Sequence, residues 1–370
     1  MDYIELRHLM EEQKEEMTPS ERMKAYMAGE EVDVLPYGLL GDEPAMADIF
    51  GFTTSQLDND PEIAAEIIRR KKAEFGMEGI GVGLGLRTIG AALGSELSIP
   101  EHGIDHIASH VLTDYGKLEK MEIPDPYHNP VLTPLIERGR RLKEIFPDTS
   151  IGTSVAGPVS TAAAIRPVEG LLRDTRKNPE LLKRLLDFTV DCSLKWLEVF
   201  CNEFGPSPAM ISDPVTCMDI LSKKQFDEFS IPYLNRLVEG MEKITGMKPS
   251  IHICGKTKPI WGNLGDMDIA AFSVDNCEDI KETREVLGNK VMLIGNVPPV
   301  DVMKEGTIDE VVAACKECIK KCADSPKGYQ LGTGCQVPIG TPRENVDAFI
   351  YAARKYGRGA KIGRMPKGIE

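Results

Sequence analysis

The chain has 370 residues, of which 42% are hydrophobic and 28% are charged, so it can build a sizeable core. Its net charge of −14 gives no general attraction for nucleic-acid phosphates or anionic lipid, and no apolar run has the roughly 18 residues that a membrane span needs. The polar, acidic start does not resemble a secretion signal, and the nine cysteines are an odd number. We therefore expect a cytoplasmic protein with reduced thiols that binds neither nucleic acid nor membrane.

Helical and strand patterns alternate along the chain. Residues 1–31 are expected to form a helical extension, with Thr18 or Ser20 as the cap of its run ERMKAYMAGE. Eight short apolar or alternating runs follow, and each predicts a strand. They are 32–40, 79–86, 150–158, 208–215, 249–255, 269–275, 291–297 and 328–335.

Long amphipathic stretches follow several of these runs, at 178–205, 222–246 and 307–325. Eight strand–helix units predict an α/β protein with a (β/α)₈ TIM barrel. A doubly wound open sheet gives the same local pattern, but the count of eight favours the barrel. The connection 87–149 is long for one unit and is expected to be an inserted helical segment before the third strand. Because no linker is visible, residues 1–370 are expected to form a single TIM-barrel domain.

The fifth run, PSIHICG, places a histidine and a cysteine two residues apart. Side chains alternate along a strand, so His252 and Cys254 point away from the face that carries Ile251 and Ile253. In a barrel they face the axis near the carboxyl end of the strand, where barrel enzymes hold their active sites. Imidazole and thiolate together suit zinc, and the spacing allows both to bind one ion.

Two further strand ends offer candidate ligands. Cys335 ends the eighth run and Asp275 ends the sixth. Two thiolates and a neutral imidazole balance the charge of zinc and leave a fourth position open, as in catalytic sites. Asp275 could fill that position at rest, and water or Cys277 are alternatives. A single cysteine is more often a small buried apolar side chain, but His-x-Cys with a third thiol at another strand end favours a metal site.

Two more polar residues end predicted strands. Asp213 ends the fourth run and Asn296 the seventh, so both are candidate catalytic residues at the barrel mouth together with Asp275. They could orient a substrate or hold the proton of a ligand histidine. Capping of the loop after the strand is the alternative reading for both.

Two other clusters have weaker signals. Cys315, Cys318 and Cys322 share one face of a predicted helix and are expected to be buried against the barrel, although the spacing is also part of an iron–sulfur pattern. His102, His106 and His110 lie four residues apart. We expect them on a helix that is solvated or lines the barrel mouth, and the sequence does not assign them a role.

Several blocks of the sequence carry a family resemblance. With HIC at 252–254 and Cys335 downstream, the chain resembles the uroporphyrinogen decarboxylase superfamily, and within it the zinc-dependent methylcobamide:coenzyme M methyltransferase branch. The resemblance implies that His252, Cys254 and Cys335 hold zinc. The other blocks that carry it are 17–37, 153–165, 213–234, 293–299 and 332–357.

The resemblance also implies an activity. It implies a transferase of one-carbon metabolism that moves a methyl group between a corrinoid, supplied by a corrinoid-binding partner protein, and a small thiol or methylated molecule. The direction of transfer stays open. A decarboxylase of a tetrapyrrole-type acid is an alternative, although the loop 38–51 lacks the arginine of that branch and 79–90 lacks its aspartate. A non-catalytic, zinc-stabilised protein that binds a corrinoid partner is a third reading.

Overall fold

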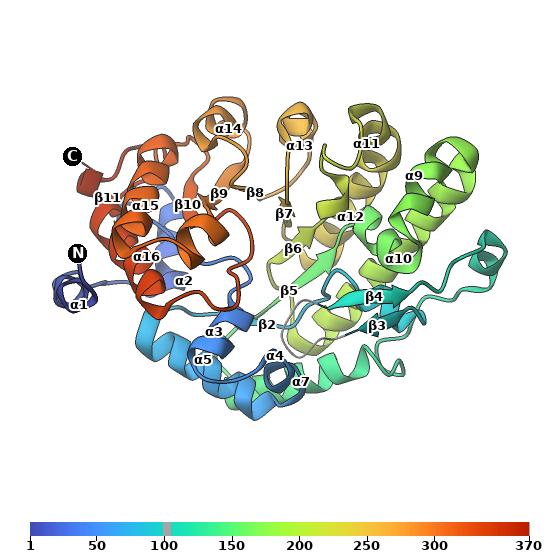
Figure 1. Cartoon of the computed structure of the whole chain (residues 1–370), viewed down its shortest axis with the longest axis horizontal. Coiled ribbons are helices and arrows are strands. Elements are labelled where there is room, and N and C mark those ends of the chain that lie inside the picture. Colours follow the sequence, from blue (N-terminus) through green and yellow to red (C-terminus); the bar gives the residue numbers. More distant parts are fainter. Residues whose placement is uncertain (99–104, 370) are drawn as a thin grey trace. The chain divides into compact units, whose positions relative to one another are not determined.

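Parallel strands joined by helices form the framework of the protein, which we describe from a computed structural model of residues 1–98 and 105–369 (Figure 1). The chain divides into two compact units. One unit contains Met1–Glu78, Cys254–Asp266 and Ala271–Glu370, and the other contains Gly79–Ile253 and Met267–Ala270. Within the described residues, no helix is both long enough and apolar enough to cross a membrane.

The unit that begins at Gly79 is built on four parallel strands in the order β7-β6-β5-β2. In chain order these strands are β2 (Ile80–Gly81), β5 (Ile151–Ala156), β6 (Ala209–Ser212) and β7 (Ser250–Ile253). The helices are α6 (Thr88–Ala92), η1 (Tyr115–Lys120), α7 (Thr133–Ile145), α8 (Pro158–Ile165), α9 (Val168–Lys177), α10 (Pro179–Phe204), η2 (Pro214–Thr216), α11 (Lys223–Phe229) and α12 (Ile231–Thr245). The strand register pairs Ser212 of β6 with His252 of β7.

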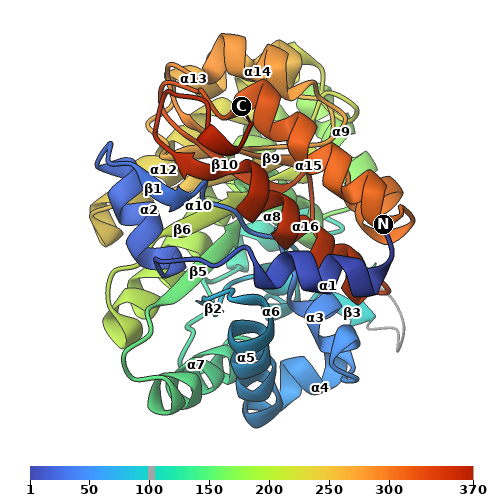
Figure 2. The same ribbon diagram turned by 90° about the vertical axis from the view of Figure 1, so that its left-hand side faces the viewer.

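The unit that contains both termini is built on three parallel strands in the order β10-β9-β8. These are β8 (Ala271–Val274), β9 (Met292–Val297) and β10 (Tyr329–Thr333). The other elements are α1 (Tyr3–Glu11), α2 (Pro19–Met27), β1 (Val32–Val34), α3 (Glu43–Ile49), α4 (Thr54–Asn59), α5 (Pro61–Phe75), η3 (Lys258–Ile260), α13 (Trp261–Asp266), α14 (Ile280–Leu287), η4 (Pro299–Lys304), α15 (Ile308–Cys322), α16 (Arg343–Tyr356), β11 (Arg358–Ala360) and η5 (Lys367–Ile369). Helix α1 packs along α16 (Figure 2).

The predicted fold class, an α/β barrel of strand–helix repeats, is confirmed. Seven of the eight predicted strands occur as parallel strands, and the three long amphipathic stretches are helices. Thr18 caps α2 as expected, because its side chain accepts a hydrogen bond from the Glu21 amide and its own amide donates one to the Glu21 carboxylate. The organisation as one domain stays a prediction.

The first predicted strand, 32–40, differs from the expectation. Its first residues form β1, which pairs antiparallel with β11. Only Tyr37 takes the place of a barrel strand, through a parallel bridge to Leu331 of β10. The Leu331 amide donates to the Pro36 carbonyl at 2.9 Å and the Gly38 amide donates to the Leu331 carbonyl at 3.0 Å. Proline has no amide hydrogen to donate, which keeps this pairing short.

The inserted segment 87–149 is also only partly helical. Strands β3 (Glu96–Ser98) and β4 (His106–Ser109) form an antiparallel hairpin within it. The helix expected around the three histidines is therefore wrong for His106, because pairing with β3 satisfies the backbone groups that a helix would use. His110 lies just after β4, where its Nε2 is 3.1 Å from the Ala163 carbonyl oxygen. His102 lies outside the described residues.

Candidate metal centre

One imidazole and two thiols converge at strand ends, as the sequence predicted. His252, Cys254 and Cys335 each offer one ligand atom, and these atoms lie within 4.8 Å of one another. The sulfur atoms of Cys254 and Cys335 are 3.1 Å apart. This is the one group of three or more metal-ligating side chains found in the described part of the chain.

Strand β7 places the first two of these residues. Ile251 and Ile253 are fully buried, as expected for the side of the strand that faces helices. His252 is 4% exposed, and its carbonyl oxygen accepts a hydrogen bond from the Asp213 amide at 3.0 Å. Cys254 follows the last residue of the strand and is partly exposed. The imidazole is therefore sheltered from water, while the thiol lies where the strand opens into a loop.

The donor set fits zinc. In a tetrahedral site the zinc–sulfur distance of about 2.3 Å places two thiolate ligands about 3.8 Å apart. The sulfur atoms here are 3.1 Å apart, so a small opening of the pair would bring both into range of one ion. A borderline-soft divalent ion is also the natural partner of mixed imidazole and thiolate donors. These three residues could therefore hold zinc.

Asp275 follows strand β8, and its carboxylate is bonded to backbone amides. It is not part of the group formed by His252, Cys254 and Cys335. Its Oδ2 accepts a hydrogen bond from the Gly255 amide at 2.9 Å, and its Oδ1 accepts one from the Cys277 amide at 2.8 Å. The side chain is 8% exposed. In this conformation both carboxylate oxygens hold loops, so a role as fourth ligand stays a prediction.

Asn296 lies in β9, and its side chain supports the turn that contains Asp275. Its Nδ2 donates to the Asp275 carbonyl at 3.0 Å and to the Glu278 carbonyl at 2.8 Å. The side-chain oxygen lies 3.8 Å from the Cys318 sulfur, which is the donor. A buried amide that bonds to the backbone of a turn fixes the turn, which agrees with the alternative reading of Asn296 as a loop cap.

Asp213 follows β6 and caps a helix from another part of the unit. It is fully buried, and its Oδ1 accepts a hydrogen bond from the Ser160 amide at 2.8 Å, in the first turn of α8. Burial raises the pKa of the Asp213 carboxyl to about 6, although the Ser160 hydroxyl and amide oppose that rise. Its Oδ2 has no hydrogen-bond partner. The carboxylate thus replaces the side-chain cap that Gly157, the N-cap residue of α8, cannot supply.

Sequence reasoning did not single out two residues of this region. Ser160 meets Asp213 as described, and Glu278 bonds to the loop that follows Cys254 through Thr257 and Lys258. A weak signal for Glu278 existed, because it comes three residues after the strand-end residue Asp275. The partner loop is distant in sequence, so the pairing itself was not visible.

The cysteines of α15 are separate from this centre. Cys315, Cys318 and Cys322 are buried, as expected for the helix face that packs on the strands. Burial raises the pKa of Cys318 to about 11 and raises the pKa values of Cys315 and Cys322 well above the ordinary value of a thiol. These thiols stay protonated at neutral pH, so they are poor metal ligands.

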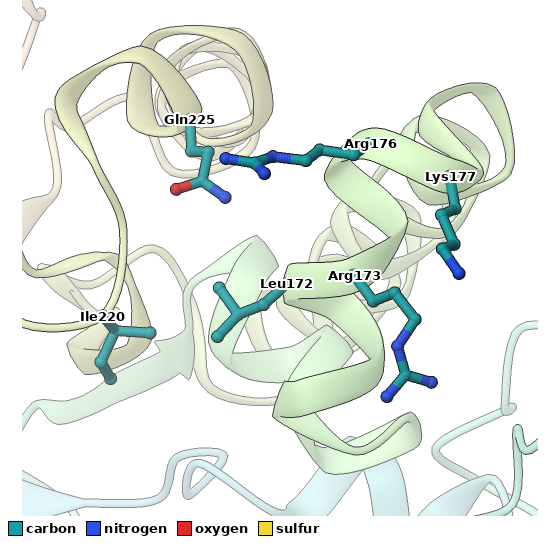
Figure 3. Close-up of a pocket in the computed structure, with 6 residues that line it drawn as sticks. All are labelled: Leu172, Arg173, Arg176, Lys177, Ile220 and Gln225. Carbon is teal, nitrogen blue, oxygen red and sulfur yellow. The ribbon is translucent and has the colours of Figure 1, made fainter.

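A pocket of about 490 Å³ lies between α9 and α11 in the unit that begins at Gly79 (Figure 3). Leu172 and Arg176 point from α9 toward Ile220 and Gln225, whereas Arg173 and Lys177 lie on another flank of the helix. The cations therefore do not converge on one point. Predicted site residues are not among its lining residues, which are Leu172, Arg173, Arg176, Lys177, Ile220 and Gln225.

The fold and the donor group define an α/β-barrel protein with a candidate thiolate metal centre at its strand ends. The model of the uroporphyrinogen decarboxylase (URO-D) family matches residues 18–356. The chain therefore belongs to the uroporphyrinogen decarboxylase family.

Relatives of two kinds are similar to the chain over most of its length. A methylcobamide:CoM methyltransferase from Methanosarcina barkeri is 24% identical over 347 residues, which are 92% of this chain and 99% of the relative. A uroporphyrinogen decarboxylase from Dechloromonas aromatica is 27% identical over 313 residues, 82% of this chain and 85% of the relative. A solved methyltransferase from Methanosarcina mazei has the same fold, with a TM-score of 0.79, 24% identity and coverage of 91% of this chain and 98% of that one.

The contact between Gly157 and Asp213 gives a test of this part of the structure. A Cβ atom at position 157 would lie 2.3 Å from the Asp213 carboxyl carbon, whereas one at Gly152 in β5 would meet nothing closer than 3.7 Å. We expect Gly157→Ala to lower the free energy of unfolding by about 1–3 kcal/mol, and Gly152→Ala to change it by less than about 1 kcal/mol. Urea unfolding of both variants checks this, and equal effects would contradict the described packing of Asp213.

Proposed function

We propose that the chain is a zinc-dependent methyltransferase that moves a methyl group between a corrinoid, carried by a partner protein, and a small thiol or methylated substrate. The observation that carries the proposal is the convergence of one imidazole and two thiols within 4.8 Å. The likeness to a methylcobamide:CoM methyltransferase over 92% of the chain supports the reaction class. The convergence concerns the predicted ligands His252, Cys254 and Cys335.

In this proposal the three residues hold the ion through one imidazole nitrogen and two sulfurs. A bound zinc ion would lower the pKa of a substrate thiol, so that the thiolate is available at neutral pH. Cys254 and Cys335 lose their protons when they bind metal, because the thiolate is the ligand form. A neutral His252 then leaves the site without net charge, with one position open for the substrate.

The remaining predicted site residues take supporting roles in the proposal. Backbone groups near strand ends bond to the side chains of all three, Asp213, Asp275 and Asn296. These bonds favour a structural role over a direct part in the reaction. Asp275 and Asn296 keep loops in place at the strand ends, and Asp213 holds the start of α8. The corrinoid is too large to enter a barrel, so its carrier must approach the strand ends where Cys254 and Cys335 lie.

The first prediction concerns metal content. We expect the purified protein to bind about one zinc ion per chain, and Cys335→Ser to lose most of it because a single thiolate and an imidazole hold zinc weakly. Cys201→Ser, which removes a partly exposed thiol of α10, is the matched control. Elemental analysis of the three proteins measures this. Wild-type zinc content in Cys335→Ser would contradict the proposed ligands.

The second prediction concerns the reaction. With methylcobalamin and a panel of small thiols, we expect the methyl group to pass to the thiol sulfur, the thiol to release its proton, and the corrinoid to be left as cob(I)alamin. The absorbance change of the corrinoid follows the reaction. Cys335→Ser should be at least about 100-fold slower, since it removes a metal ligand. Methyl transfer at equal rates with and without zinc would count against the proposal.

Removal of the metal separates an enzyme from a zinc-stabilised binding protein. Catalytic zinc sites keep an open position and are built on a folded scaffold, whereas structural sites contribute to folding itself. We expect a chelator to abolish methyl transfer while circular dichroism stays that of the folded protein. Unfolding on chelation would favour the non-catalytic reading, in which the chain binds a corrinoid partner.

A decarboxylase is the second candidate, because a uroporphyrinogen decarboxylase from Dechloromonas aromatica is 27% identical over 82% of the chain. The loop 38–51 contains three acids and no arginine, which is unfavourable for a substrate with many carboxylates. Incubation with uroporphyrinogen and measurement of released CO₂ tests this candidate. Release of CO₂ at a zinc-independent rate would replace the methyltransferase proposal.

A further inference from the structure

The turn formed by residues 275–278 lies against both cysteine-bearing loops of the candidate metal centre. Asp275 accepts a hydrogen bond from the Gly255 amide, the residue directly after Cys254. On the other side, a Cβ atom at Gly334 would lie 2.5 Å from the Asn276 amide nitrogen, so the backbone directly before Cys335 touches the same turn. The turn is therefore in a position to set the spacing of the two thiols.

Glu278, the last residue of this turn, bonds to the loop after Cys254 through one carboxylate oxygen. Its Oε1 accepts hydrogen bonds from the Thr257 amide, from the Lys258 amide at 2.8 Å, and from the Thr257 hydroxyl at 3.4 Å. Thr257 is fully buried and its hydroxyl also accepts a hydrogen bond from the Trp261 indole at 3.0 Å. One carboxylate thus holds three donors at the point where the loop enters η3 and α13.

The charge of Glu278 suits this position. The amides of Thr257 and Lys258 begin the helical segment that runs through η3 into α13, and the start of a helix attracts a negative charge. Bonds from amides to an ionised carboxylate are stronger than bonds between neutral groups. The Lys258 ammonium group pairs with Glu282 at 2.6 Å instead, so the two acids hold different parts of the same residue.

The turn itself is anchored to the strands. Asn296 of β9 donates to the carbonyl oxygens of both Asp275 and Glu278, and the Glu278 amide donates to the Asp275 carbonyl at 3.1 Å. The contacts form a continuous path from β9, through the turn, to the loop after Cys254. The bonds from Asn296 and from the Thr257 amide are buried or partly buried, and the bond from the Lys258 amide is exposed.

We propose that Glu278 is a positioning residue of the metal centre, which holds the loop 255–258 so that the Cys254 thiol stays beside the Cys335 thiol. The inference rests on the proposed metal site, and it adds a residue whose side chain bonds to the loop after Cys254. Glu278 acts through the backbone of Thr257 and Lys258, three and four residues from Cys254. Asp275 is a less decisive test of this idea, because it is also a candidate ligand.

The test compares three variants of the full chain. Glu278→Ala removes all three bonds, Glu278→Gln keeps a side-chain oxygen as acceptor, and Glu282→Ala is the matched control, since it removes an acid that bonds only to the Lys258 ammonium group in this loop. Each protein is stripped of metal and its zinc affinity is measured by competition with a chromophoric chelator. The cobalt-substituted forms are compared by the thiolate-to-cobalt charge-transfer absorption, and unfolding is followed by circular dichroism.

We expect Glu278→Ala to bind zinc about 10- to 100-fold more weakly, as is common when a group that orients a metal ligand is removed. Its charge-transfer band should be weaker, because one thiolate is less well placed. Glu278→Gln should recover most of the affinity, and Glu282→Ala should bind like the wild type. If Glu278 only capped the helical segment, Glu278→Ala would lower the unfolding temperature without changing the cobalt spectrum.

Three results would overturn the inference. These are wild-type zinc affinity and cobalt spectrum in Glu278→Ala, an equal loss in Glu282→Ala, or a loss in Glu278→Gln as large as in Glu278→Ala. Failure of the metal site itself is recognised separately, because Cys335→Ser would then keep its zinc. If Cys335→Ser loses zinc while Glu278→Ala keeps it, the metal site stands and only the positioning role of Glu278 is wrong.

Discussion

The short distance between two thiols is the constraint on which the rest of this structure depends. The sulfur atoms of Cys254 and Cys335 lie 3.1 Å apart although 81 residues separate them in the chain. Each cysteine comes directly after, or two residues after, a parallel strand, so the strands bring the loops together and the loops must then hold the sulfurs. A displacement of either loop by a few tenths of an ångström to an ångström would change which metal the pair can hold, because zinc requires a nearly tetrahedral set of ligands.

The carboxylates near the strand ends are bonded to backbone amides, so they stabilise the local backbone. Asp275 and Glu278 accept hydrogen bonds from backbone amides of the loop after Cys254, and Asp213 accepts one at the start of α8. Backbone amides are strong donors, and when they are buried they need acceptors. Strand-end acids of this kind therefore fix the strand-end loops while they leave the sulfurs available for metal.

The environment divides the nine cysteines into chemically different groups. Cys254 and Cys335 are partly exposed and lie beside each other, whereas the three cysteines of α15 are buried in the core. Burial disfavours a thiolate, so the core cysteines stay protonated and do not compete for the metal. Cys254 and Cys335 instead lie side by side near the His252 imidazole, within reach of one ion. The same residue type thus serves packing in one helix and supplies the candidate metal ligands at the strand ends.

The sequence predicted the α/β class and the grouping of His252, Cys254 and Cys335, because both follow from periodicity and from residues placed at strand ends. Alternation along PSIHICG was enough to separate the isoleucines from the candidate ligands His252 and Cys254. It could not predict Glu278, because the hydrogen bonds of that residue join loops about twenty residues apart, and sequence spacing does not encode such contacts. The hairpin around His106 was missed for a similar reason, since its pairing with β3 is a tertiary contact that overrides local helical spacing.

X-ray absorption at the zinc edge of the zinc-loaded protein tests the central claim most directly. The account predicts a four-coordinate ion with two sulfur neighbours at about 2.3 Å and at least one imidazole nitrogen at about 2.0–2.1 Å. A zinc shell without sulfur, or one with four sulfur neighbours, would contradict the claim that His252, Cys254 and Cys335 form an open metal centre.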